Sequence, residues 1–165
     1  MEIERKWLIS GFPTGLELAE EADSWQGYLS IEPEVRIRKK NKQGEIICYL
    51  CIKSDGTLAR TEVELPISQE QFEELLAMIP YELIHKHQRK MKLPGNLLME
   101  CNQVDQGRET SFYYAEVEFS SVEEAEKFVF PVEIFDKKIS GNVQEVTEDK
   151  TCKMKNYWKR TRLCD

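Results

Sequence analysis

Apolar and charged residues alternate along the sequence in one segment of the chain after another. Near the N-terminus, Glu2, Glu4 and Lys6 share one parity, whereas Ile3 and Trp7 share the other. Successive side chains of a β-strand point to opposite faces, so this period of two predicts strands with one charged and one apolar face. Eight such strands are predicted, near residues 1–9, 25–32, 34–41, 45–54, 58–67, 83–93, 97–104 and 111–120.

Turn residues separate several of the predicted strands. A short polar triplet that contains glycine is typical of a tight turn, and such triplets occur at residues 42–44, 54–56 and 94–96. Links this short join antiparallel neighbours, because parallel strands need a long crossover. The expected fold is therefore a single α+β domain over residues 1–165 that is dominated by an antiparallel sheet.

Four segments interrupt the strand pattern and are predicted to be helical. Ser68 and Gln71 form a capping-box sequence ahead of an apolar run, and Ser121 begins a second helix in a similar way. The other two helical segments are predicted at residues 16–22 and in part of the basic tail after Asp149.

Composition limits the classes of protein that fit. A net charge of -7 and an isoelectric point near 5.1 argue against a broad nucleic-acid-binding surface, which needs a basic footprint. No apolar run approaches the length of a membrane span, and the start of the chain lacks the pattern of a signal peptide. The five cysteines, an odd number, predict reduced thiols. A soluble cytoplasmic protein, monomeric or homodimeric, is expected, with neither a nucleic acid nor a membrane as partner.

Charged pairs or triplets occupy one face of nearly every predicted strand, and both signs are represented. If these faces point outward, the domain is an ordinary sheet with a salt-bridged surface. If they point inward, the sheet is a closed barrel whose lumen needs ligands, because buried unpaired charge is costly. Carboxylate clusters suit hard divalent cations such as Mg²⁺ or Mn²⁺, whereas arginine and lysine suit phosphate. The inward arrangement would therefore indicate metal-assisted phosphoryl chemistry.

The charged motifs, taken in order, resemble those of the CYTH domain, also called the triphosphate tunnel metalloenzyme family. The E-x-E-x-K signature of that family is matched by Glu2-Ile3-Glu4-Arg5-Lys6. The other motifs of the family follow in the same order. They are an R-x-R strand, a strand that ends in lysine, an R-x-E-x-E strand, an A-E-x-E strand and a closing E-V-T-x-D with K-M-x-N. These are matched at residues 36–38, 51–53, 60–64, 115–118, 145–149 and 153–156.

The resemblance implies an eight-stranded antiparallel closed barrel, a tunnel with its charged faces inward and a few flanking helices. Family members act on triphosphate-bearing substrates with Mg²⁺ or Mn²⁺. By position, the metal would be held by Glu2, Glu4, Glu62, Glu64, Glu116 and Glu118. The phosphates would be held by Lys6, Arg36, Arg38, Lys53, Arg60 and Arg89. Catalysis is expected to involve Glu4, Lys6 and Lys53.

Three positions depart from the family pattern. His87-Gln88-Arg89 stands where the family usually has K-x-R, unless Lys86 takes that place by a shift in register. Glu100-Cys101-Asn102 stands where the family has E-x-D, and Cys152 replaces an aromatic residue. These departures put substrate preference and rate in question more than the fold.

The expected activity is the metal-dependent hydrolysis of a short polyphosphate, foremost inorganic triphosphate to pyrophosphate and phosphate. A class IV-like adenylate cyclase and a thiamine triphosphatase are rival activities within the family, although no sequence feature demands the site for a base or heterocycle that they need. A non-catalytic module that binds polyphosphate or a nucleotide is the third alternative. The retained carboxylates weigh against it, because an anion binder gains nothing from them.

Overall fold

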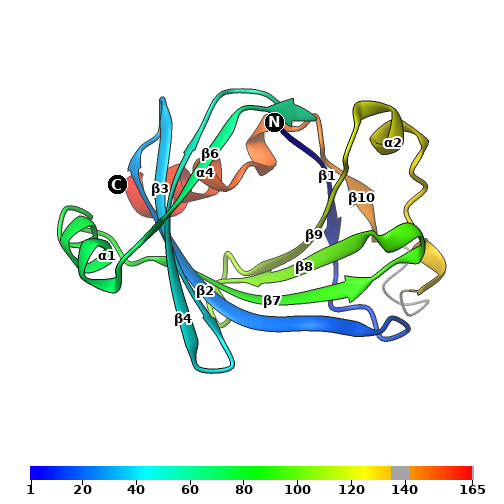
Figure 1. The fold of residues 1–165 in the computed structure, drawn as a ribbon, viewed down its shortest axis with the longest axis horizontal. Coiled ribbons are helices and arrows are strands. Elements are labelled where there is room, and N and C mark those ends of the chain that lie inside the picture. Colours follow the sequence, from blue (N-terminus) through cyan, green and yellow to red (C-terminus); the bar gives the residue numbers. More distant parts are fainter. Residues whose placement is uncertain (135–141, 165) are drawn as a thin grey trace.

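The computed structural model of the protein describes residues 1–134 and 142–164. These residues form a strand-rich fold with short helices (Figure 1). The strands are β1 (Glu2–Ile9), β2 (Leu18–Ser30), β3 (Glu34–Lys42), β4 (Glu45–Lys53), β5 (Ala59–Arg60), β6 (Glu62–Ile67), β7 (Ile84–Lys92), β8 (Leu98–Val104), β9 (Phe112–Glu118) and β10 (Gln144–Glu145). The helices are α1 (Gln69–Leu76), α2 (Val122–Lys127) and α4 (Met154–Trp158), with single turns η1 (Pro94–Asn96), η2 (Val132–Ile134), η3 (Lys150–Cys152) and η4 (Lys159–Leu163).

One antiparallel sheet in the order β10-β1-β9-β8-β7-β2-β3-β4-β6 curls into a nearly closed barrel (Figure 1). The closure depends on β5, which pairs with β1 through Glu2 opposite Arg60 and Ile3 opposite Ala59. The next strand, β6, pairs instead with β4. The predicted strand at residues 58–67 is therefore split in two, because its ends bond to different neighbours. The predicted class, a strand-dominated barrel with few helices, is confirmed.

The predicted helix at residues 16–22 is wrong. Leu18 already belongs to β2, where it pairs with Met91, and Ala22 pairs with Gln88. A helix of two turns gains too few hydrogen bonds to be stable alone, so pairing with β7 decides the conformation of this segment.

Local capping signals correctly predicted two other helices. Before α1, the Gln71 amide donates to Ser68 Oγ at 3.0 Å and the Ser68 amide donates to Gln71 Oε1 at 2.9 Å. Before α2, the Glu124 amide donates to Ser121 Oγ at 3.1 Å. The tail is partly helical, as predicted, in η3, α4 and η4. None of the helices in the described part of the chain has the length and apolarity needed to cross a bilayer.

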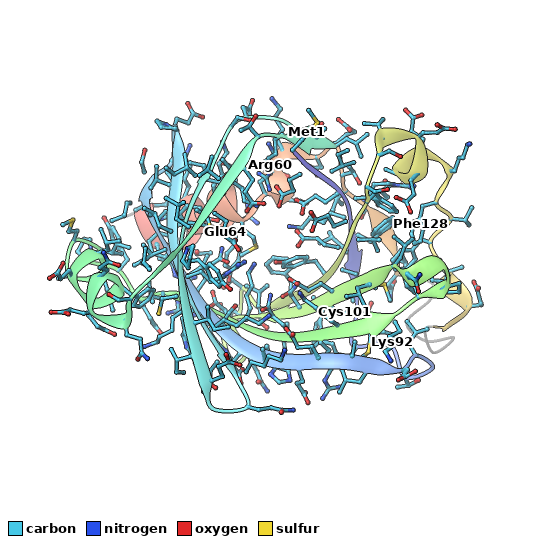
Figure 2. The ribbon with its side chains drawn as sticks, in the orientation of Figure 1. Met1, Arg60, Glu64, Lys92, Cys101 and Phe128 are labelled. Carbon is cyan, nitrogen blue, oxygen red and sulfur yellow. The ribbon has the colours of Figure 1, made fainter. Side chains whose placement is uncertain are left out.

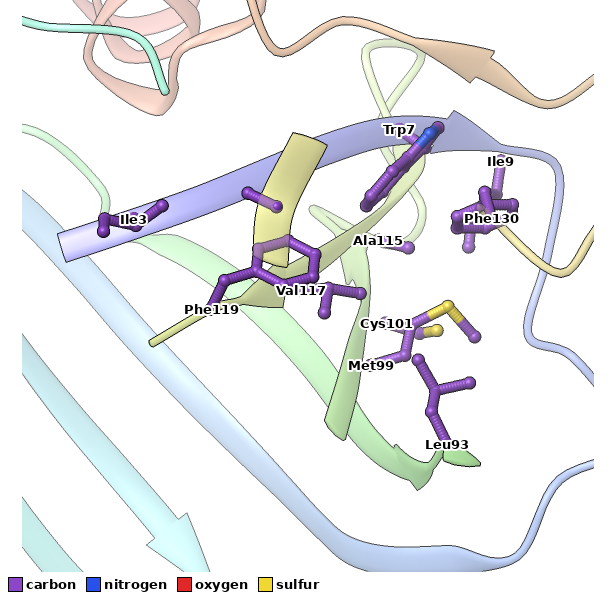
Figure 3. Close-up of a cluster of buried hydrophobic side chains, with 11 residues drawn as sticks. Ile3, Trp7, Ile9, Leu93, Met99, Cys101, Ala115, Val117, Phe119 and Phe130 are labelled. Carbon is purple, nitrogen blue, oxygen red and sulfur yellow. The ribbon is translucent and has the colours of Figure 1, made fainter. Parts of the chain in front are cut away.

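Much of the apolar core lies against the outside of the barrel wall. Trp7, Met99 and Val117 belong to one cluster (Figure 3). Ala125 of α2, which packs on β1, is part of the same cluster. A second cluster lies where α1 packs on β3 and β4 and where α4 meets β2, and it contains the fully buried Phe72. Because helices and loops cover apolar strand faces from outside, the opposite faces are free to carry charge into the barrel.

Candidate active site

A cavity of about 750 Å³ lies inside the barrel, in the size range of sites for small molecules. We call it the tunnel. Figure 2 labels Arg60 and Glu64, two of the side chains that line it. The tunnel is lined by all the predicted site residues except Arg89, namely Glu2, Glu4, Lys6, Arg36, Arg38, Lys53, Arg60, Glu62, Glu64, Glu116 and Glu118.

Strand parity explains which side chains reach the tunnel. Glu4 and Lys6 of β1 line it, whereas Trp7 packs in the outer apolar cluster. The β1–β9 register places Glu4 opposite Glu118 and Lys6 opposite Glu116, so the carboxylates of both strands stand on one wall. The charged strand faces therefore point inward.

Cations and carboxylates pair within the tunnel. Glu2 contacts Lys53 Nζ and Arg60 Nε, each at 2.8 Å, and Arg60 Nη2 lies 3.1 Å from Glu4 Oε1. Further pairs at 3.2, 2.9 and 3.3 Å join Lys53 to Glu62, Arg38 to Glu64 and Lys6 to Glu116. Almost every carboxylate that the sequence assigns to metal thus contacts a cation that it assigns to phosphate.

Burial and crowding separate the acidities of these carboxyl groups. Burial, followed by repulsion from Glu116 and Glu2, raises the pKa of Glu4 to about 7. Burial also acts to raise the pKa of Glu2, but Lys53 and Arg60 outweigh it and lower that pKa to about 2. Glu4 therefore holds a proton more readily than Glu2 does, chiefly because it is buried and also because two carboxylates repel its charge.

The carboxylates of the tunnel, in contrast to the neighbouring thiol of Cys51, are donors that fit a hard divalent cation. Glu62 and Glu64 each offer an oxygen that lies, with Cys51 Sγ, within 4.8 Å of the other ligand atoms of this group. The raised pKa of Glu4 shows that a further positive charge beside the β1–β9 wall would be favourable. Carboxylate oxygens are the ligands that Mg²⁺ and Mn²⁺ prefer.

Two arginines of β3, across the tunnel from β1 and β9, each have an Nε–H donor that makes no hydrogen bond to the described residues. Arg36 is 7% exposed, and the Nε atoms of Arg36 and Arg38 are buried with no hydrogen-bond partner among the described residues. A buried N–H without an acceptor is unfavourable, so these atoms favour an anion beside them. A chain of phosphate oxygens would supply the acceptors.

A comparison with protein-family models finds none that matches. Among curated proteins, an inorganic triphosphatase from Nitrosomonas europaea is 34% identical over 157 residues, which are 93% of this chain and 94% of that protein. The chain belongs to the triphosphate tunnel metalloenzyme family. A crystal structure of an inorganic triphosphatase shares 31% identity and a TM-score of 0.61, and the match covers 95% of this chain and 93% of that one.

Solved structures of lower sequence identity share the fold. A protein from Pyrococcus horikoshii is 17% identical with a TM-score of 0.58, over 77% of this chain and 83% of that one. An adenylyl cyclase-like protein from Hippeastrum, described as having a dominant triphosphatase activity, is 15% identical with a TM-score of 0.52, over 76% of this chain and 83% of that one. At this identity the likeness concerns architecture alone.

The prediction that Arg89 faces the phosphates is wrong. Arg89 Nε donates to Glu21 Oε1 at 2.8 Å, and its guanidinium lies 4.5 Å from the centre of the Phe12 ring, away from the tunnel. His87 points the same way and also contacts Glu21, at 2.9 Å. The side chains of β7 that point into the tunnel are adjacent in sequence to His87 and Arg89. Lys86 therefore occupies the position of the first cation in the K-x-R motif of the family.

Sequence reasoning considered Lys86 only as an alternative register and missed Lys90. Both line the tunnel, and Lys86 Nζ donates to the Tyr114 hydroxyl at 2.5 Å. Burial lowers the pKa of Lys86 to about 7. Parity places residues 86, 88 and 90 on one face and residues 87 and 89 on the other, but both faces are polar, so the pattern does not tell which one points inward.

The departure at Asn102 lies beside the inward-facing positions of β7. Gln88, on the same face as Lys86, donates from Nε2 to Asn102 Oδ1 at 2.7 Å and to Glu100 Oε1 at 2.8 Å. Read in the observed register, a neutral glutamine–asparagine pair takes the place of the second cation of K-x-R and the second acid of E-x-D.

The C-terminal segment completes the tunnel. Thr147, Asp149, Cys152 and Lys153 line it after β10. Lys153 Nζ donates to the Gly56 carbonyl, which ties this segment to the loop between β4 and β5. The closing motif therefore contributes polar groups to the tunnel wall as well as packing.

Proposed function

We propose that this protein hydrolyses inorganic triphosphate to pyrophosphate and phosphate with Mg²⁺ or Mn²⁺. The observation that carries the proposal is the pair of buried Nε donors of Arg36 and Arg38, which have no hydrogen-bond partner among the described residues and lie across the tunnel from a carboxylate wall. The relative from Nitrosomonas europaea, an inorganic triphosphatase, supports the choice of substrate.

The carboxylates assigned to the cation are Glu2, Glu4, Glu62, Glu64, Glu116 and Glu118. When bound, a divalent cation would neutralise charge on phosphate oxygens and make water a better nucleophile. The substrate would lie against Lys6, Arg36, Arg38, Lys53 and Arg60, with Lys86 and Lys90 in place of Arg89.

Three of these side chains are placed to take part in the reaction itself. The oxygen of a water molecule attacks the terminal phosphorus, and the bond from this phosphorus to the bridging oxygen breaks to release pyrophosphate. Glu4, on the carboxylate wall of the tunnel, would accept the proton of that water. Lys6 and Lys53 stabilise negative charge that develops on the transferred phosphoryl group and the leaving group.

The test is phosphate release from inorganic triphosphate, ATP, thiamine triphosphate and pyrophosphate, each with Mg²⁺, Mn²⁺ or EDTA. Fast release from inorganic triphosphate that EDTA abolishes is the expected result. Cyclic AMP and pyrophosphate from ATP would instead make the protein a cyclase. A rise in melting temperature with triphosphate and no turnover of any substrate would make it a binding module.

Exchanging Arg36 for glutamine is expected to raise the KM for triphosphate by about 10- to 100-fold, because a charged hydrogen bond to phosphate is lost. The matched control is Arg89→Gln, the same change on the same barrel but outside the tunnel, which should leave the KM unchanged. Equal KM values for the two variants would refute the placement of the phosphate chain. Steady-state kinetics at saturating Mn²⁺ measures both.

A further inference from the structure

Glu34 is a buried carboxylate that the sequence motifs did not single out. It begins β3, is 4% exposed and lines the tunnel. Its Oε2 lies 3.6 Å from Nη1 of Arg60, the cation with which it pairs among the described residues. A buried carboxylate is stable only when a cation or hydrogen-bond donors compensate it, so this contact needs an explanation.

Arg60 lies between carboxylates from two sides. Its Nε and Nη2 contact Glu2 and Glu4 of β1 at 2.8 and 3.1 Å, while Nη1 faces Glu34 of β3. The guanidinium therefore uses one edge for the wall assigned to the cation and the other for Glu34. Since β5 pairs Arg60 with Glu2 at the seam of the barrel, the backbone of Arg60 is held as well.

A divalent cation on Glu2 and Glu4 would compete with Arg60 for the same oxygens. Its positive charge would also repel the guanidinium, which already shares Glu2 with Lys53, whose Nζ lies 2.8 Å from Glu2 Oε1. The Nε and Nη2 donors would then be released, whereas the contact of Nη1 with Glu34 would remain. Those two donors would be available to phosphate oxygens in the same tunnel.

We propose that Glu34 is a positioning residue for Arg60: it retains the guanidinium in the tunnel while a cation on Glu2 and Glu4 frees its other edge to bind phosphate. Cation binding thereby converts Arg60 from a counter-ion into a phosphate ligand. This inference rests on the proposed function for the identity of the anion, a short polyphosphate, and it names a residue that the motifs of the family do not contain in this chain.

The test measures binding without turnover. The probe is a triphosphate analogue in which methylene groups replace both bridging oxygens, titrated calorimetrically with Mn²⁺ or with EDTA. Glu34→Gln preserves shape and removes one negative charge from the tunnel. The matched control, Glu100→Gln, removes the same charge beside Lys90, 3.6 Å away, rather than beside Arg60.

In Mn²⁺, Glu34→Gln is expected to weaken binding of the analogue by about tenfold, because Arg60 loses its support. Glu100→Gln should leave binding equal or tighter, because it only removes repulsion. In an Arg60→Met background the Glu34→Gln change should no longer weaken binding, as a double-mutant cycle requires of residues that act together. In EDTA, Glu34→Gln should not weaken binding.

Several other outcomes would contradict the role of Glu34 or the proposed function. If the wild type binds the analogue and the two glutamine variants shift its affinity in the same direction in Mn²⁺, the role of Glu34 is refuted while the proposed function stands. A loss that persists in the Arg60→Met background refutes it too. If the wild type does not bind the analogue with Mn²⁺, both proposals fall. Should Glu34→Gln not fold, Glu34→Asp, which withdraws the carboxylate from Arg60 but keeps its charge, is expected to weaken binding by a smaller factor.

Discussion

Glu4→Gln is expected to lower kcat for triphosphate hydrolysis by about 100- to 10,000-fold, the range that loss of a general base covers. Glutamine keeps the volume of the side chain but neither accepts the proton of the attacking water nor offers a charged oxygen to a cation. The measurement is phosphate release at saturating triphosphate and Mn²⁺. Glu126→Gln, on the exposed face of α2, is the control and should retain full activity. Turnover by Glu4→Gln within a few-fold of the wild type would remove Glu4 from the mechanism.

The same variant should be more stable than the wild type in alkaline, metal-free solution. The folded pKa of Glu4, about 7, lies above its usual value of 4.5, so the folded protein binds more protons than the unfolded chain between these two pH values. Stability is therefore lost as pH rises through this window, and glutamine removes the loss. The gain in free energy of unfolding should reach about 2–3 kcal/mol at pH 8 and vanish near pH 4. Urea denaturation in EDTA at both pH values measures it, and an equal gain at both would show that the cause is not ionisation.

Asp105→Ala is expected to destabilise the fold by about 3–5 kcal/mol, the cost of leaving a buried charge without its partner. Asp105 Oδ2 accepts from Arg162 Nη1 at 2.6 Å and from the Tyr157 hydroxyl at 2.7 Å, and both members of the ion pair are 3% exposed. Asp105 also accepts from the His85 amide at 3.1 Å. The pair joins the end of β8 to the C-terminal turn η4, so its loss releases the tail from the barrel.

The interaction has a matched test. Asp105→Ala with Arg162→Met removes both charges and should recover much of the lost stability, because no buried charge is left unpaired. Equal stability of single and double variants in urea denaturation would contradict the ion-pair argument. The pKa of Asp105 is lowered, since its hydrogen bonds from Arg162 and Tyr157 outweigh burial, which acts to raise it. Its contribution is therefore present above its unfolded pKa and is lost as the pH falls through the lower, folded pKa.

Which charged residues share one strand face could be predicted because local patterns specify it, whereas the inward direction of these faces was implied by the resemblance to the family. In β1, β3, β6 and β9 the charged residues alternate with apolar ones, and a strand admits only two faces. The helix caps at Ser68 and Ser121 were predictable for the same reason, since each is satisfied within four residues of sequence. The prediction failed in β7, where K-H-Q-R-K presents polar residues on both faces and the pattern alone cannot say which one points inward.

The sequence by itself determined that this chain would form antiparallel strands with one charged face and that these faces would carry both carboxylates and cations, because alternation is a local property. Only the tertiary structure decided that Lys86 rather than Arg89 enters the tunnel, because the pairing of β7 with β2 and β8 selects the face. It also decided that Glu34 meets Arg60 at the seam of the barrel, since β3 and β5 approach each other only when the sheet curls. Burial, and with it the raised pKa of Glu4, likewise arises from closure, which brings strands far apart in sequence around one small volume.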